Sequence, residues 1–120
     1  MTEPRIAIIG AGIGGLACGL ALQRAGVPFT IYEQASALTE IGAAIALSAN
    51  GSRELARFGC LPGLEATSCE PTELIWRGWR DHTRVAAHPV RKDCAYRKTY
   101  GAPYFGIHRA DLQKVMRAQL

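Results

Sequence analysis

Three glycines near the amino terminus have the spacing of a dinucleotide-binding loop. The pattern is G-x-G-x-x-G, and its members are Gly10, Gly12 and Gly15. In such a loop the first glycine permits a tight turn, the second lets the backbone approach a pyrophosphate, and the third lets a helix pack closely on a strand. The amides of Ile13 and Gly14 would then lie at a helix start, where unpaired N–H groups and the helix dipole favour an anion. The sequence therefore predicts a pyrophosphate site at this loop.

A carboxylate follows the glycines at a spacing that suits an adenosine ribose. Glu33 comes 23 residues after Gly10, at the expected end of a second strand, where it can accept hydrogen bonds from the ribose hydroxyls. An acidic side chain here disfavours a 2′-phosphate, so we expect a tightly bound FAD or NAD rather than NADP. Gln34 is a further candidate contact to the same edge of the adenosine. These residues alone leave FAD and NAD as alternatives.

The elements that must position these residues form a βαβ unit. The apolar run at residues 6–9 predicts a strand buried on both faces of a parallel sheet. Apolar residues at helical spacing predict a helix over residues 14–25, and Gly26 supplies a left-handed stop. The β-rich run at residues 29–32 predicts the second strand. Strand, helix and strand within about 30 residues indicate an α/β fold with a right-handed crossover.

Weaker patterns continue along the chain. Residues 43–47 predict a short strand, and Asn50 is a candidate cap for a helix over residues 52–58. Two strands joined by a polar turn, and then a helix with an apolar stripe, are also predicted. They cover residues 74–79, 85–89 and 110–120.

The composition is that of an ordinary globular protein. The 120 residues are 48% hydrophobic and 20% charged, which disfavours a disordered chain and allows one small domain or part of one. The formal net charge of +4 arises in the second half, where the cations at residues 77–98 face only Asp81 and Asp93. Two interpretations remain: a field that attracts phosphates or an aromatic carboxylate, and a solvated loop surface. No nucleic-acid-binding signature accompanies these cations.

The cysteines and histidines lack metal-binding spacing. The four cysteines include no C-x-x-C pair and the three histidines are irregularly spaced, so we expect no metal and interpret the cysteines as reduced thiols of a cytoplasmic protein. The uncharged run at residues 6–22 carries five glycines and is shorter than the ~20 residues that span a bilayer. We therefore expect neither a signal segment nor a membrane span.

Three motifs stand in order along the chain. They are residues 10–33 with the glycine loop, residues 40–51 (EIGAAIALSANG), and residues 100–112, which contain YGAPY and IHRADL. Together they resemble the FAD-dependent aromatic-ring hydroxylases, the class A flavoprotein monooxygenases, in their salicylate hydroxylase-like branch. The resemblance implies an incomplete Rossmann-like FAD/NAD(P)-binding domain of the glutathione reductase type, and it makes FAD the preferred ligand. It also implies that Arg109 lies at a helix start beside the ribityl and phosphate region of the flavin.

The resemblance further implies an oxidoreductase that uses NADH or NADPH and oxygen to hydroxylate a small aromatic, such as a salicylate-like phenolic acid. We expect residues 1–120 to be the amino-terminal part of the FAD-binding domain, without the substrate part and the carboxyl-terminal half of the FAD site. Such a fragment would be inactive alone, and no catalytic residue is assigned to it. We expect the full-length protein to be cytoplasmic and to bind neither nucleic acid nor membrane, and a dimer is one candidate for its oligomeric state.

Two alternatives remain open. An NAD-binding domain of a dehydrogenase shares the glycine fingerprint, although it would normally continue with alternating strands and helices rather than a hairpin at residues 74–89. A non-catalytic gene remnant is the other alternative. Because partners of the predicted sheet are missing, we also expect the isolated chain to be marginally stable, to expose apolar surface and to associate.

Overall fold

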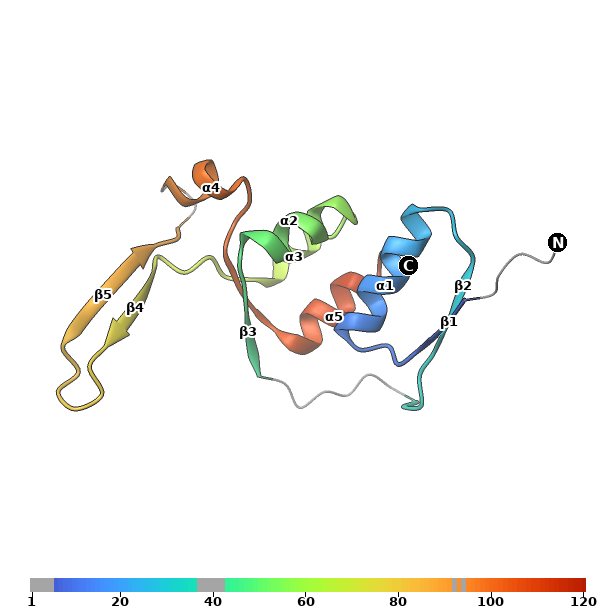
Figure 1. Ribbon diagram of the computed structural model, residues 1–120, viewed down its shortest axis with the longest axis horizontal. Coiled ribbons are helices and arrows are strands. Elements are labelled where there is room, and N and C mark those ends of the chain that lie inside the picture. Colours follow the sequence, from blue (N-terminus) through green and yellow to red (C-terminus); the bar gives the residue numbers. More distant parts are fainter. Residues whose placement is uncertain (1–5, 37–42, 92, 94) are drawn as a thin grey trace.

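The computed structural model describes residues 6–36, 43–91, 93 and 95–120. Its elements follow one another along the chain as drawn in Figure 1. They are β1 (Ile6–Ile9), α1 (Ile13–Arg24), β2 (Phe29–Tyr32), β3 (Ala44–Leu47), α2 (Ala49–Arg57), α3 (Leu61–Thr67), β4 (Glu73–Arg77), β5 (Arg84–Pro89), α4 (Ala95–Tyr100), β6 (Phe105–His108) and α5 (Arg109–Arg117).

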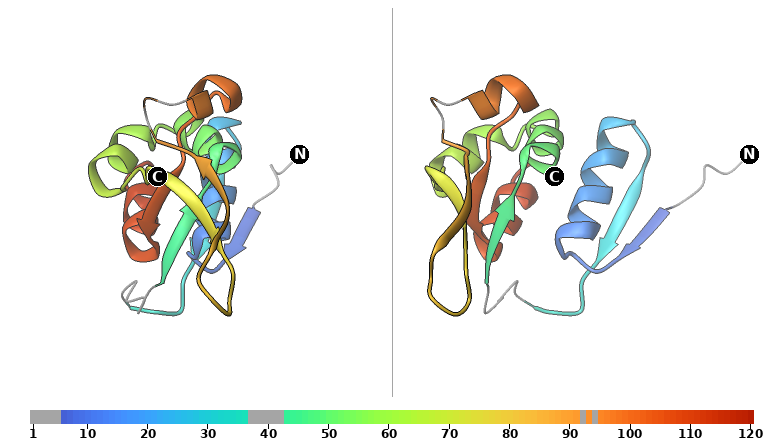
Figure 2. Two further views of the ribbon diagram at one scale, coloured as in Figure 1. Left: turned by 90° about the vertical axis from the view of Figure 1, so that its left-hand side faces the viewer. Right: turned by 60° about the vertical axis from the view of Figure 1, so that its left-hand side comes forward.

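Within the described ranges the strands form three separate two-stranded sheets. β1 pairs with β2 in parallel, with Ile6 opposite Phe29 and Ile9 opposite Tyr32. β3 pairs with β6, and β4 pairs with β5, both antiparallel. The parallel pair with α1 between its strands confirms the predicted βαβ unit. In Figure 2 this unit stands as one layer beside a second layer that contains β3, α2 and α5.

The hydrophobic core lies where these two layers meet. α1 contributes Leu16 and Leu20, and α5 contributes Leu112 and Met116, all of them buried. The remaining core side chains come from α2, α3, the turn between those helices, β6 and α5. They are Leu55, Cys60, Leu64, Phe105, Ile107 and Val115. The apolar stripe predicted near the end of the chain therefore packs the last helix on the first.

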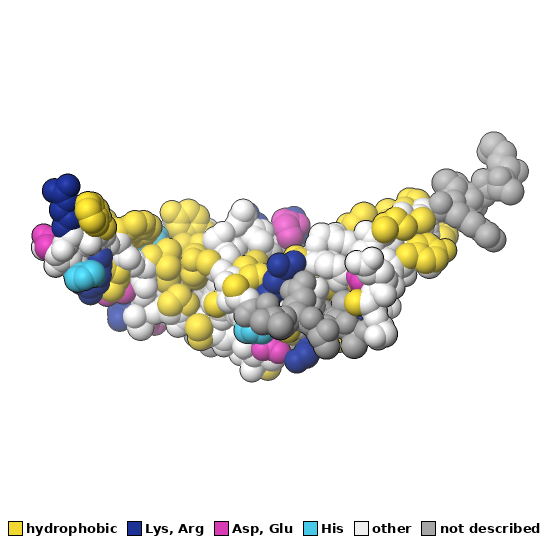
Figure 3. Space-filling view, turned by 90° about the horizontal axis from the view of Figure 1, so that it is seen from below, with side chains coloured by type: hydrophobic (Ala, Val, Ile, Leu, Met, Phe, Trp, Pro, Cys, Tyr) yellow, Lys and Arg dark blue, Asp and Glu magenta, His cyan; other side chains and the backbone are white. Residues whose placement is uncertain are grey.

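The molecule is elongated, with extents of 63 × 32 × 24 Å. Its radius of gyration is 17.4 Å, whereas a compact domain of this length has about 14 Å. The β4–β5 hairpin projects from one end and β1–β2 lies toward the other (Figure 1). In Figure 3 hydrophobic side chains gather at both of these ends. The exposed apolar surface that the sequence predicted is therefore present.

The predicted burial of β1 on both faces is wrong for this chain. Ile8 is buried, but Ile9 is 82% exposed. α1 covers one face of the β1–β2 pair, and within the described part of the chain no second layer covers the other face. The apolar run thus predicts the strand correctly, but it does not predict how much of the strand is buried.

The element boundaries follow the sequence closely at most positions. The first helix, the second strand, the third strand and the hairpin lie within one or two residues of their predicted bounds. The last helix ends at Arg117, earlier than predicted. Three elements were not predicted, because their sequence patterns are too short to be recognised. They are α3, α4 and β6.

The prediction of Asn50 as a helix cap is wrong. α2 begins at Ala49 and its N-cap is Ser48, whose backbone is extended. The carbonyl of Ser48 accepts hydrogen bonds from the amides of Gly51 and Ser52, both at 3.0 Å. Ala49 and the hydroxyl of Ser52 are buried, and that hydroxyl donates to the carbonyl of Pro103 at 2.6 Å. This packing anchors the helix against residues 101–104, so it starts one residue before Asn50.

Candidate nucleotide-binding site

The glycine loop leaves its amides available at the start of α1. Gly10 has a φ of +98°, and its amide donates to the carbonyl of Tyr32 at 2.7 Å, which ties the loop to the end of β2. The first hydrogen bond of the helix runs from the amide of Leu16 to the carbonyl of Gly12 at 2.9 Å. The amides of Ile13 and Gly14 therefore have no carbonyl partner within the helix, as at any helix start. They are free to meet an anion.

Gly12 and Gly15 have opposite surroundings. A Cβ atom at Gly15 would lie 2.0 Å from the carbonyl oxygen of Gly10, so only glycine lets α1 approach the loop this closely. A Cβ atom at Gly12 would meet nothing within 4 Å. The space in front of Gly12 is thus open, and a side chain there would occupy the place that a ligand needs. Gly15 serves packing, and Gly12 keeps the approach to the loop clear.

Glu33 lies against the same loop. One carboxylate oxygen, Oε2, accepts a hydrogen bond from the amide of Ala11 at 2.7 Å, and Oε1 accepts one from the amide of Ala35 at 2.9 Å. These bonds, from Ala35 first and Ala11 second, lower the pKa of Glu33 below its ordinary value. The side chain is ionised and exposed at neutral pH, so it can accept further hydrogen bonds from hydroxyl groups.

A cavity of about 350 Å³ opens beside Glu33. Its lining comes mainly from the βαβ unit and the residues after β2, but two of its residues come from the far end of the chain. The lining residues are Ala11, Leu16, Ile31, Glu33, Ala35, Ser36, Arg117 and Leu120. Sequence reasoning missed Arg117 and Leu120 because no local pattern joins them to the glycine loop. Only the packing of α5 on α1 brings them there.

The structure does not bring every predicted site residue to this cavity. Gln34 is exposed beside Glu33 and is not part of the lining. Arg109 is the first residue of α5, directly after β6, and its amide donates to the carbonyl of Ala43 at 3.2 Å. It is exposed and lies outside the lining of the cavity. Contacts of Gln34 and Arg109 with a nucleotide stay predictions.

Two of the cations at residues 77–98 form ion pairs with glutamates. Arg84 pairs with Glu73 at 2.6 Å, and Arg97 pairs with Glu70. The expectation that this group faces only two aspartates was wrong because β4 and the segment before it bring two glutamates alongside it. These pairs favour the interpretation of a solvated, ion-paired surface.

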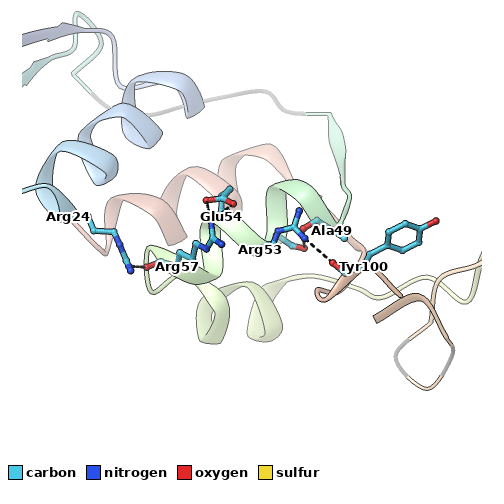
Figure 4. Close-up of polar contacts among 7 residues, drawn as sticks. Arg24, Ala49, Arg53, Glu54, Arg57 and Tyr100 are labelled. Carbon is cyan, nitrogen blue, oxygen red and sulfur yellow. Dashed lines mark hydrogen bonds and ion pairs between the residues drawn. The ribbon is translucent and has the colours of Figure 1, made fainter. Parts of the chain in front are cut away.

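Arginines of the first half mainly secure helix ends. Arg53 donates to the carbonyl of Tyr100 at 3.0 Å, and Arg24 donates to the carbonyl of Arg57 (Figure 4). Arg57 itself pairs with Glu54 at 2.8 Å on the same helix. Within the described residues, no group of three histidine, cysteine, aspartate or glutamate side chains could hold a metal ion. In the same ranges no helix has the length and apolar character needed to cross a bilayer.

Comparison with known proteins finds similarity that includes the glycine loop. The profile of the family "NAD(P)-binding Rossmann-like domain" matches residues 8–53. The chain is 42% identical over 112 residues to a 3-amino-4-hydroxybenzoate 2-monooxygenase of Streptomyces platensis, covering 93% of the chain and 28% of that protein. It is 37% identical over 118 residues to a 6-hydroxynicotinate 3-monooxygenase of Bordetella bronchiseptica, covering 98% of the chain and 30% of that protein.

Solved structures of FAD-bound proteins are also similar to this chain. The structure of Klebsiella pneumoniae HpxO complexed with FAD and uric acid matches with a TM-score of 0.74 and 30% identity, over 95% of the chain and 28% of that protein. Its R204Q variant complexed with FAD matches with a TM-score of 0.78 and 25% identity, over the same shares. The predicted fold class is thereby confirmed as a partial Rossmann-like α/β fold. The chain spans less than a third of the length of these relatives.

Proposed function

We propose that this chain, a homologue of the amino-terminal part of FAD-dependent aromatic monooxygenases, binds the adenosine and pyrophosphate of FAD. The observation that carries the proposal is the junction of the glycine loop with Glu33. The free amides and the open space at Gly12 belong to the loop that Glu33 contacts through the amide of Ala11, and Ala11 and Glu33 both line the cavity. The pyrophosphate would lie on the amides of Ile13 and Gly14, and Glu33 would accept the ribose hydroxyls.

The glycine loop and the cavity beside Glu33 leave space for an adenine dinucleotide. A side chain at Gly12 would fill the space that the pyrophosphate requires, and the chain keeps that space clear. The cavity of about 350 Å³ beside Glu33 is of the size that small-molecule sites have. The residues present therefore fit the adenosine half of the cofactor. We assign Gln34 a contact to the adenosine edge and Arg109 a later contact to the ribityl and phosphate region.

The activity of the whole protein is proposed from its relatives. They include a 3-hydroxybenzoate 6-hydroxylase of Aquipseudomonas alcaligenes, 35% identical over 111 residues, 92% of the chain and 28% of that protein. We propose hydroxylation of a phenolic aromatic acid with NADH or NADPH and oxygen. The redox chemistry is that of flavin, and the protein supplies binding, orientation and exclusion of water. Residues 1–120 contribute the amino-terminal part of the FAD-binding domain, and catalytic residues belong to other segments.

An NAD-binding domain is the second candidate, because the matching family is described as an NAD(P)-binding domain. Calorimetric titration of the chain with FAD, ADP, NAD and FMN separates the two candidates. We expect FAD and ADP to bind, and FMN, which lacks adenosine, not to bind. NAD binding more tightly than FAD would overturn the assignment in favour of a dehydrogenase domain.

A matched variant shows whether the glycine loop is the site. Gly12→Ala places a methyl group in the space for the pyrophosphate without touching the protein. We expect it to lose FAD and ADP binding while the far-ultraviolet circular dichroism spectrum stays unchanged. Full binding by this variant would place the nucleotide elsewhere on the chain.

A further inference from the structure

One wall of the cavity beside Glu33 belongs to α5. Arg117, the last residue of that helix, and Leu120 line the cavity opposite residues of the βαβ unit. Two contacts hold the end of α5 in place. Met116 is fully buried in the core shared with α1, and the side-chain amide of Gln23 donates to the carbonyl of Gln119 at 2.8 Å. The position of Arg117 is therefore set by packing on both sides of it.

The guanidinium of Arg117 has no partner among the described residues, whereas several other cations there do have one. Lys114, one turn earlier on the same helix, pairs with Asp111 at 3.1 Å. Arg53 and Arg24 donate to backbone carbonyls of other segments. Within the described part of the chain, Arg117 is exposed and its side chain makes no ion pair or hydrogen bond. Its guanidinium is thus available to whatever occupies the cavity.

The remaining lining of the cavity is largely aliphatic. Leu16, Ile31 and Leu120 present aliphatic side chains to the cavity, and Glu33 is its carboxylate. With a ribose at the carboxylate, the aliphatic walls offer the attached base an apolar surface. A guanidinium is planar and stacks on aromatic rings, whereas an ammonium does so less well.

The geometry points to Arg117 as a positioning residue for the adenine base, with its guanidinium stacked on the ring while Glu33 holds the ribose. This inference rests on the proposed function, because it requires an adenine nucleotide at the glycine loop. The sequence predicted a site made of residues 10–34 and Arg109. The inference adds to it a residue from the far end of the chain. It also gives the packing of α5 on α1 a direct effect on nucleotide affinity.

The test is a set of titrations with FAD, ADP and inorganic pyrophosphate. The proteins are the wild-type chain and the variants Arg117→Ala, Arg117→Lys and Lys114→Ala. We expect Arg117→Ala to weaken FAD and ADP about fivefold, as for an exposed cation–π contact, and to leave pyrophosphate binding unchanged. Arg117→Lys keeps the charge without the plane and should recover only a minor part of the loss. Lys114→Ala removes a positive charge from the same last turn of α5. It should change none of the three affinities.

Each other outcome has a defined meaning. If Arg117→Ala weakens pyrophosphate as much as ADP, and Arg117→Lys restores both, the side chain acts only as a charge and the stacking role is overturned. If the wild-type chain and Arg117→Ala bind FAD equally, the inference fails while the proposed function stands. If the wild-type chain binds neither FAD nor ADP, the proposed function fails and the role of Arg117 fails with it. Circular dichroism spectra of the variants establish that alanine and lysine, both good helix formers, leave α5 folded.

Discussion

The βαβ unit and the β4–β5 hairpin both expose apolar side chains, but only the βαβ unit also packs a helix into the core. In the βαβ unit, α1 buries Leu16 and Leu20 against α5, so that helix has partners on both sides. In the β4–β5 hairpin, Trp76, Trp79 and Val85 are 53%, 82% and 71% exposed. The hairpin satisfies its backbone through strand pairing, but its large side chains find no partner among the described residues of the core.

The difference shows where the stability of this chain resides. A helix that joins two layers gains from the burial of apolar area on each side, whereas a two-stranded hairpin alone is marginally stable. We therefore expect unfolding to be governed by the contacts of α1, and the hairpin to open at a lower free energy than the core. Substitutions in the two regions should have effects of very different size.

The largest effect is expected at Gly15. In Gly15→Ala the new Cβ would lie 2.0 Å from the carbonyl oxygen of Gly10, and a backbone atom cannot give way as a flexible side chain can. We expect the free energy of unfolding to fall by about 3 kcal/mol or more, a large share of the stability of a small domain. Thermal and urea denaturation followed by circular dichroism measure the change.

Gly12→Ala is the matched control for that experiment. Its backbone angles, φ −67° and ψ 176°, are open to any residue, and its Cβ would meet nothing. We expect a change in unfolding free energy within about 1 kcal/mol, as for a change at a helix N-cap. Equal destabilisation by the two alanines would show that α1 does not pack on the loop as described, and the contrast between the two ends would lose its basis.

A smaller effect, visible as a pH dependence, is expected at Glu33. The hydrogen bonds from Ala35 and Ala11 lower the pKa of this carboxyl in the folded state. Its contribution to stability is therefore fully present above the ordinary glutamate pKa of roughly 4.3, and it is lost as the pH falls through the lowered folded-state value. Glu33→Gln should flatten the decline in melting temperature over that acidic range. A decline of unchanged steepness would mean that the carboxylate does not hold the loop.

The features that the sequence predicted are those that short segments determine by themselves. Gly10 and Gly26 were placed at turns and have φ values of +98° and +69°. The hairpin turn was recognised from its polar residues, and the amide of Gly78 does donate across it to the carbonyl of Thr83 at 2.8 Å. Each of these depends on backbone freedom or on alternation within a few residues, so the rest of the fold does not change it.

The features that could not be predicted from the sequence depend on contacts between distant segments. Arg117 reaches the cavity only because α5 packs on α1. The start of α2 at Ala49 is set by packing of Ser52 against the carbonyl of Pro103, about half the chain away. Ile9 has the pattern of a core strand residue and yet is exposed, because the layer that would cover it is not among the described residues. No local pattern carries such information.

The smallest effect on stability is expected at the hairpin, where it sharpens the contrast with the core. Trp79 is 82% exposed, and the guanidinium of Arg80 lies 5.0 Å from the centre of its ring. Trp79→Ser should change the free energy of unfolding by no more than about 0.5 kcal/mol. It should nevertheless reduce self-association, because it removes a large apolar group from an exposed surface. Sedimentation velocity over a range of concentrations measures association, and denaturation of the same samples measures stability. A large loss of stability with unchanged association would mean that the hairpin packs on the core in solution, and the two ends would then be alike.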